Sequence, residues 1–140
     1  MTDADYDVCD IQGDLFALAA EQGYEVCVFA EAYLSSEFCR RAFDCLYSRY
    51  QHTDAEESWE MMQPEIGSRL KKYEDGTRFR RDIAAWMGFT YRQLWYETGV
   101  YSARLVQKIP PREMARLYMG YHTLDEEMAA ERLIESYGLR

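Results

Sequence analysis

The sequence predicts an all-α protein, folded as a single compact bundle of about seven to eight helices over residues 1–140. Val and Ile, which favour strands, number only five each, and Pro numbers three. Apolar residues recur at helical spacing along most of the chain. Two segments also have the spacing of a capping box at a helix N-terminus. With 48% hydrophobic and 15% aromatic residues, the chain can supply a core of the size that 140 residues require.

Three helices are expected in the first fifty residues. The first has apolar residues three or four apart, is interrupted by Gly13 and is ended by Gly23. Residues 24–34 are apolar nearly all round, which is typical of a helix at the centre of a fold. An apolar stripe at helical spacing predicts a third helix from Cys39 to Tyr50, after a cap at the preceding serines.

A fourth helix should begin at Asp54, because Thr53 and Glu56 have the spacing of a capping box. Pro64 lies in its continuation and is expected to kink or split the helix near Gln63.

The strongest helical pattern runs from Phe79 to Thr98 and ends at Gly99, after a turn at Asp75–Gly76 and a cap at Thr77. Its apolar stripe consists of Phe79, Ile83, Trp86, Met87, Thr90, Tyr91, Leu94, Trp95 and Thr98.

Three helices are expected in the last forty residues. A short one covers about residues 102–109 and is broken by Pro110–Pro111. The next has one apolar face from Met114 to Tyr121. A second capping box, residues 123–126, opens the last helix, which ends before Gly138.

Charge is unevenly distributed along the chain. The net charge is −12 over residues 1–68, +6 over residues 69–116 and −3 over residues 117–140, which gives −9 in total. The basic block has two interpretations: it pairs loosely with the acidic first half, or it forms a docking face for an acidic partner. The overall negative charge weighs against nonspecific binding of nucleic acid.

The sequence offers no recognisable catalytic or metal-binding constellation. The two histidines are 70 residues apart, and the four cysteines form no closely spaced pair, so no metal or other cofactor is expected. The cysteines are interpreted as small packing residues. Adjacent glutamates occupy the first turns of helices, where they complement the helix dipole. An enzyme is therefore the third interpretation, after a binding module and a DNA-binding regulator.

A cytoplasmic location is expected. Residues 1–7 are acidic where a secretory signal would be basic, and no segment is apolar enough for a membrane span. The irregular cysteine spacing favours a reducing compartment, without a disulfide.

The aromatic residues of the C-terminal half have two interpretations. The set comprises Trp86, Tyr91, Trp95, Tyr96 and Tyr101. It contributes either to the core or to an exposed, tyrosine-rich contact patch.

Residues 102–121 have the outline of a helix-turn-helix. The segment before Pro110 would be its first helix, and residues 111–121 its recognition helix, with Arg112 and Arg116 as basic side chains. Two arginines on a protein of net charge −9 would bind DNA weakly, so a helix-turn-helix DNA-binding regulator remains the alternative function.

Residues 89–99 and 121–131 resemble segments of a group of small, uncharacterised, all-helical proteins of anaerobic gut bacteria. The similarity covers roughly residues 24–137 and is clearest over 86–137. Members of that group are encoded beside small proteins with an ADP-ribosyltransferase-like fold, as in toxin–antitoxin loci. The resemblance implies a bacterial, cytoplasmic protein whose partner is such a toxin, and it implies no catalytic residue.

Together these observations predict a non-enzymatic protein-interaction module, in the manner of an antitoxin-like inhibitor or accessory of a neighbouring enzyme. The chain has thirteen arginines and only three lysines, and arginine is favoured where a planar group binds a carboxylate in two places. Six arginines are expected to be exposed: Arg78, Arg81, Arg92, Arg104, Arg112 and Arg116. The partner-binding residues predicted from helical phase are Arg92, Tyr96, Tyr101, Arg104, Arg112 and Arg116.

Overall fold

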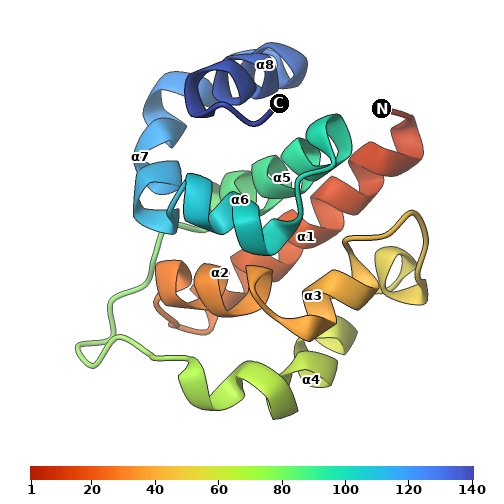
Figure 1. Cartoon of the computed structure of the whole chain (residues 1–140). Helices are drawn as coiled ribbons and strands as arrows, with labels where there is room; N and C mark the ends of the chain where they lie inside the picture. Colours follow the sequence, from red (N-terminus) through yellow and green to blue (C-terminus); the bar gives the residue numbers. More distant parts are fainter.

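A computed structural model describes all of residues 1–140 and confirms the all-α prediction (Figure 1). Eight α-helices contain well over half of the chain, and its single β-bridge joins Tyr24 to Lys72. The helices are α1 (Asp3–Glu21), α2 (Val26–Leu34), α3 (Glu37–Ala42), α4 (Ala55–Ile66), α5 (Arg81–Thr98), α6 (Ser102–Lys108), α7 (Pro111–Tyr121) and α8 (Glu126–Tyr137). Two 3₁₀ helices, Arg49–His52 and Gly67–Arg69, precede and follow α4. No helix combines the length and the apolar character needed to cross a membrane.

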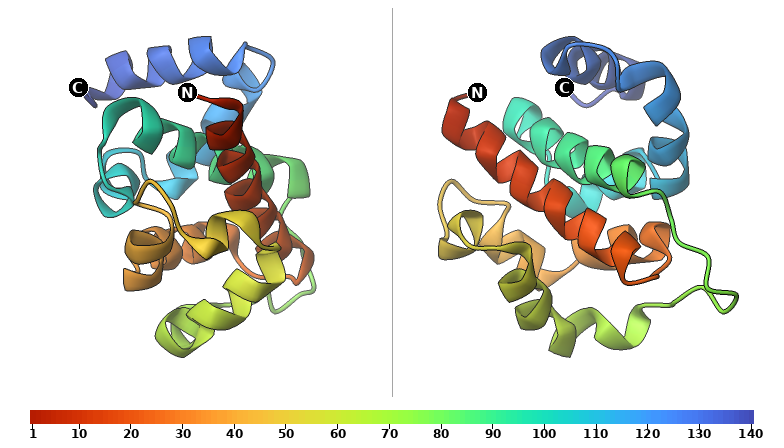
Figure 2. Two further views of the ribbon diagram at one scale, coloured as in Figure 1. Left: turned by 90° about the vertical axis from the view of Figure 1, so that its right-hand side faces the viewer. Right: turned by 180° about the vertical axis from the view of Figure 1, so that it is seen from behind.

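Helices α1 and α5 lie side by side through the middle of the molecule (Figure 2). Their backbones approach closely because glycine occupies the contact on both helices. A Cβ atom on Gly13 would lie 2.8 Å from Ala85 O, and one on Gly88 would lie 2.6 Å from Gln12 O. Gly13 was expected to interrupt the first helix, but α1 is continuous and this glycine is the point at which α5 crosses it.

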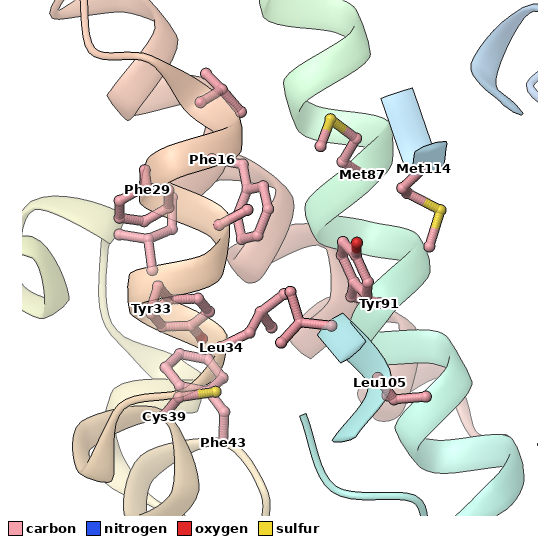
Figure 3. Close-up of a cluster of buried hydrophobic side chains, with 14 of the residues drawn as sticks. Phe16, Phe29, Tyr33, Leu34, Cys39, Phe43, Met87, Tyr91, Leu105 and Met114 are labelled. Atoms are coloured by element: carbon pink, nitrogen blue, oxygen red, sulfur yellow. The ribbon is translucent and has the colours of Figure 1, made fainter. Parts of the chain in front are cut away.

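Helix α2 lies in the core, as its apolar composition predicts. Phe29 and Tyr33 are fully buried on it, and their rings stack with centroids 5.6 Å apart. Phe16 of α1 meets both rings edge to face, at 5.3 and 5.9 Å (Figure 3). This aromatic cluster joins the α1–α5 pair to α2 and α3.

The third helix is much shorter than predicted, because it ends at Ala42 instead of continuing to Tyr50. Residues 43–48 form an irregular loop, and side chains of the loop, of the next 3₁₀ helix and of α5 bond to the backbone carbonyls of residues 42–45. Gln51 donates to Ala42 O and Cys45 O, at 3.1 Å each, and Arg92 donates to Phe43 O. These tertiary bonds replace the helical bonds that residues 43–48 would otherwise make.

Two predictions about the fourth helix, its first residue and the effect of Pro64, differ from what α4 shows. Its N-cap is Asp54, which accepts from Glu57 N at 3.0 Å, so the helix proper begins one residue later than predicted. Pro64 was expected to kink or split the helix, and α4 is not split there, because it continues through Pro64 to Ile66. A proline removes a single helical hydrogen bond, and here that loss falls in the last turn.

The last four helices mostly follow the sequence pattern. Gly99 and Gly138 end α5 and α8 in the left-handed conformation that glycine allows. Two starts differ from the prediction: Thr77 does not cap α5, which begins without a side-chain cap, and Asp125 rather than Thr123 caps α8. Aspartate is the better N-cap when both residue types are within reach.

Candidate functional site

The six predicted contact residues occupy three different environments. Tyr101, Arg104, Arg112 and Arg116 are exposed, on or beside α6 and α7. Tyr96 on α5 is half-buried. Arg92, also on α5, is fully buried and is the largest fully buried side chain of the protein. The predicted exposure is therefore correct for Arg78, Arg81, Arg104, Arg112 and Arg116 and wrong for Arg92.

Arg92 was assigned to a solvent face because helical phase places it beside the apolar stripe of α5. Such reasoning assumes that a helix buries only one face. In the structure the five consecutive residues 90–94 are all buried, so this stretch of α5 is enclosed on every side. A side chain at any phase of this turn lies inside the protein, and Arg92 cannot contact a partner there.

The buried Arg92 guanidinium is saturated with hydrogen bonds. Nε and Nη2 donate to Gln12 Oε1, at 3.0 and 2.8 Å. Nη1 donates to Phe43 O at 3.1 Å and to Asp44 Oδ1 at 2.7 Å. Nη2 also donates to Ser102 Oγ at 2.9 Å. Such bonds are needed, because an unpaired charge in the interior would be very costly.

The surrounding groups also hold Arg92 in its charged form. Burial alone would lower the pKa of this guanidinium, but Cys39, Tyr33 and Asp44 more than offset that effect, and the pKa is raised above its ordinary value. The side chain of Asp44 is itself only 3% exposed. Arg92 and Asp44 thus form a buried ion pair at the junction of α5 with the 43–48 loop.

Asp44 also bonds to the first residue of α6, so it connects the ion pair to that helix. Its Oδ2 accepts from Ser102 N at 2.9 Å, and its Oδ1 accepts from Ser102 Oγ at 2.6 Å. The N-cap residue Tyr101 makes no side-chain capping bond, so a carboxylate from a distant segment satisfies the first N–H of α6. Arg92 therefore positions Tyr101 and α6 from inside the protein.

Five exposed side chains of α6, α7 and the residue before them form what we term the α6–α7 face. These are Tyr101, Arg104, Lys108, Arg112 and Arg116. Tyr101 is 58% exposed. On α7 the two arginines are four residues apart on its outward side, and Met119 continues that side at 70% exposure.

The cations of the α6–α7 face have no carboxylate partner within the chain. The only acidic residue of α6 and α7 is Glu113, and its carboxylate accepts from Tyr137 Oη at 2.8 Å. Elsewhere seven arginines each have a carboxylate partner, and those of the basic block are Arg80, Arg81 and Arg92; the other four are Arg40, Arg41, Arg49 and Arg140. Intramolecular pairing thus accounts for part of the basic block and leaves the α6–α7 face with unneutralised charge.

The aromatic set divides between the core and the surface. Tyr91 is buried and donates to Ile109 O, while Trp86 and Trp95 are half-buried. Tyr96 packs edge to face on Trp95 at 4.8 Å, and burial, followed by the nearby Asp5 carboxylate, raises its pKa to about 12. Only Tyr101 of the five is exposed, so Tyr96 is not part of the α6–α7 face.

The helix-turn-helix outline corresponds to two real helices, with Ile109 and Pro110 between them. Leu105 and Val106 of α6 and Met114 of α7 are buried against the core. The basic side chains of α7 remain outside, which is compatible with either a protein or a nucleic-acid partner.

Residues of metal-binding or nucleophilic type are dispersed. No three His, Cys, Asp or Glu side chains lie close enough together to hold a metal ion, and all four cysteines are free. Burial raises the pKa of the Cys9 and Cys39 thiols, which makes both less reactive as nucleophiles.

Comparison of the chain with protein-family models, with curated proteins and with solved structures finds no match.

Proposed function

We propose that this chain is a non-enzymatic protein-interaction module of the bacterial cytoplasm, which binds an acidic patch of another protein through the α6–α7 face. The observation that supports this most is the set of four exposed cations without a carboxylate partner, next to the exposed Tyr101. Arg and Tyr are enriched at protein interfaces, where Arg binds carboxylates in two places and Tyr contributes contact area.

The buried support of the face favours binding. The Arg92–Asp44 pair fixes the start of α6, and Tyr91 bonds to Ile109 O, where α6 ends. A surface held in one conformation before the partner arrives loses less entropy on binding than a flexible one. The α6–α7 face is thus held in one conformation before a partner binds, in keeping with a protein that acts by binding rather than by catalysis.

The proposed partner is a neighbouring enzyme with an ADP-ribosyltransferase-like fold, and the proposed role is that of an antitoxin-like inhibitor. This identification rests on the resemblance of residues 89–99 and 121–131, together with the chemistry of the face. The arginines would pair with carboxylates on the toxin, and Tyr101 would pack into the contact. The inhibitor would act by covering a surface of the enzyme.

A helix-turn-helix regulator is the alternative function. The observation in its favour is that Arg112 and Arg116 share the outward side of α7, the helix that would enter the major groove. The net charge of −9 opposes it, because most of the protein surface repels the phosphate backbone.

The decisive experiment measures binding of the purified protein to the product of the neighbouring gene, for the wild type and three single variants. Tyr101→Ala and Arg104→Ala remove contacts of the face. Arg132→Ala is the matched control, because Arg132 is an exposed arginine on α8, outside the face. Each variant of the face is expected to weaken binding by about tenfold or more, and the control is expected to leave it unchanged.

The interaction should also weaken as salt increases, because its charges are exposed. The proposal is contradicted if no neighbouring gene product binds at micromolar concentration, or if the control weakens binding as much as Arg104→Ala. Sequence-specific binding to the protein's own promoter at physiological salt would instead establish the alternative.

A further inference from the structure

A cleft lies on a different part of the protein, between α1, α5 and the junction of α7 with α8. Its volume is about 260 Å³, slightly below the range typical of sites for drug-sized ligands. The walls include the aromatic side chains of Trp86, Phe89 and Tyr121. A ligand that fits this space is therefore small and has an apolar part.

Two polar side chains that line the cleft have unused hydrogen-bonding groups. Gln93 is 2% exposed, and its Nε2 donates to Glu126 O at 3.1 Å, while its Oε1 has no partner within the protein. Thr90 is 3% exposed, and its hydroxyl makes no hydrogen bond. Both oxygens can accept a hydrogen bond, and neither is fully enclosed by the protein, so both are open to the cleft that they line. The cleft thus presents acceptors to a donor that the chain does not supply.

The charged residues of the cleft also favour a ligand that donates hydrogen bonds, because they are acidic. Asp10 from α1 and Glu126 from α8 line it as exposed side chains, and no Lys or Arg accompanies them. The other ionisable residues of the lining are Tyr121 and His122, whose Nδ1 lies 2.6 Å from Tyr118 O. Partial desolvation raises the pKa of both carboxyl groups although the two residues are largely exposed, and repulsion between carboxylates adds to this effect, from Asp14 and Asp7 on Asp10 and from Asp10 and Asp125 on Glu126. A cation bound between the two carboxylates would relieve that repulsion.

The aromatic walls of the cleft also favour a cationic ligand. Rings of Trp, Tyr and Phe attract a cation placed over their faces, and the attraction is stronger where water is excluded. The acidic residues along α1 add a negative field that concentrates cations near the cleft.

We infer that this cleft binds a small organic cation, a primary amine with a compact apolar body, with its ammonium group directed to Asp10, Glu126 and Gln93. The ammonium group would donate to the carboxylates and to Gln93 Oε1, and the apolar body would pack on Trp86. The site shares no residue with the α6–α7 face, so it is independent of the proposed interaction with a partner protein.

The test uses three probes of similar shape and different charge: 2-phenylethylamine, 2-phenylethanol and phenylacetate. Binding is followed by chemical-shift changes of the backbone amides of the ¹⁵N-labelled protein. The amine is expected to saturate shifts around Gln93 and Trp86 with a dissociation constant of about 1 mM or lower, while the alcohol binds at least about tenfold more weakly and the anion does not bind.

Charge-removing variants locate the contact. Asp10→Asn and Glu126→Gln are each expected to weaken amine binding about fivefold to tenfold. Their matched controls are Asp14→Asn, one turn further along α1, and Glu127→Gln, the next residue of α8, since neither residue lines the cleft. Both controls are expected to bind the amine within about twofold of the wild type.

Three outcomes would overturn the inference. These are no saturable binding of the amine, equal binding of the alcohol, or equal losses in the variants and their controls. Circular dichroism of each variant confirms that the helices are intact, so that a loss of binding is not due to unfolding.

Discussion

Replacing Arg92 by Met tests whether the buried ion pair supports the fold. The substitution keeps much of the apolar volume but removes the charge, so the side chain of Asp44, 3% exposed, becomes a buried carboxylate without a counter-charge. Phe43 O also loses its bond to the guanidinium. Asp44 keeps its two bonds to Ser102, and Gln12 Oε1 keeps the bond donated by Tyr33 Oη at 2.8 Å.

Removing one partner of a buried ion pair typically costs about 3–5 kcal/mol. An unpaired buried carbonyl costs about 1–3 kcal/mol, but the two effects overlap. We expect the free energy of unfolding to fall by about 4 kcal/mol, a large part of the 5–15 kcal/mol typical of a domain. Urea denaturation followed by circular dichroism measures this change.

A double-mutant cycle separates the ion pair from other effects of the substitution. In the Arg92→Met background, Asp44→Asn removes the stranded charge, so the double variant should be more stable than the sum of the two single losses implies, by about 2 kcal/mol. Arg104→Met is the exposed control and should change stability by less than about 0.5 kcal/mol. A loss below about 1 kcal/mol for Arg92→Met, or strictly additive losses in the cycle, would refute the reasoning.

Two further predictions concern stability. Gly88→Ala should destabilise the protein by about 2 kcal/mol in urea denaturation, because the added Cβ would overlap Gln12 O. The control is Gly120→Ala on α7, where nothing lies within 4 Å of the added Cβ, and it should instead stabilise the protein by about 0.5–1 kcal/mol. Equal effects at the two sites would contradict the close crossing of α1 and α5. The pKa values of Asp10 and Glu126 are raised in the folded protein, which therefore binds more protons than the unfolded chain near pH 5, so the free energy of unfolding should rise as the pH falls from about 7 to about 5. This gain should shrink in Asp10→Asn, and an unchanged gain would show that other groups cause it.

The parts of the fold that local chemistry determines could be predicted from the sequence. Gly99 and Gly138 end their helices because a left-handed residue is needed there, and neighbouring residues alone indicate this. The central position of α2 likewise follows from its own composition. The irregular loop after Ala42 could not be predicted, because Arg92, which bonds to Phe43 O, is 49 residues away in the sequence, and no local pattern indicates that Ser48 and Gln51 bond to Ala42 O.

The candidate site shows the same division. Helical phase correctly placed Arg104 and Arg112 on the surface, because α6 and α7 each bury one side only. It failed for Arg92 because α5 is enclosed by several elements, which no pattern within one helix reveals. The one hint in the sequence was Gln12, a polar residue next to Ile11 and four residues after Val8, beside the apolar stripe of the first helix, since a buried amide requires a polar partner.

The glycine contact between α1 and α5 has a consequence for how the protein is made. Helix α1 precedes α5 in the chain, and α5, the helix against which it packs most extensively, ends only at Thr98. Until then the surface of α1 around Gly13 lacks the α5 backbone that covers it, although α2 can already pack on Phe16, and the chain between α1 and α5 must close a long loop before the core is complete. Synthesis of this protein thus includes an interval in which the Gly13 surface of α1 is available to chaperones, and that interval ends when Ala85 and Gly88 of α5 pack on Gly13 and Gln12.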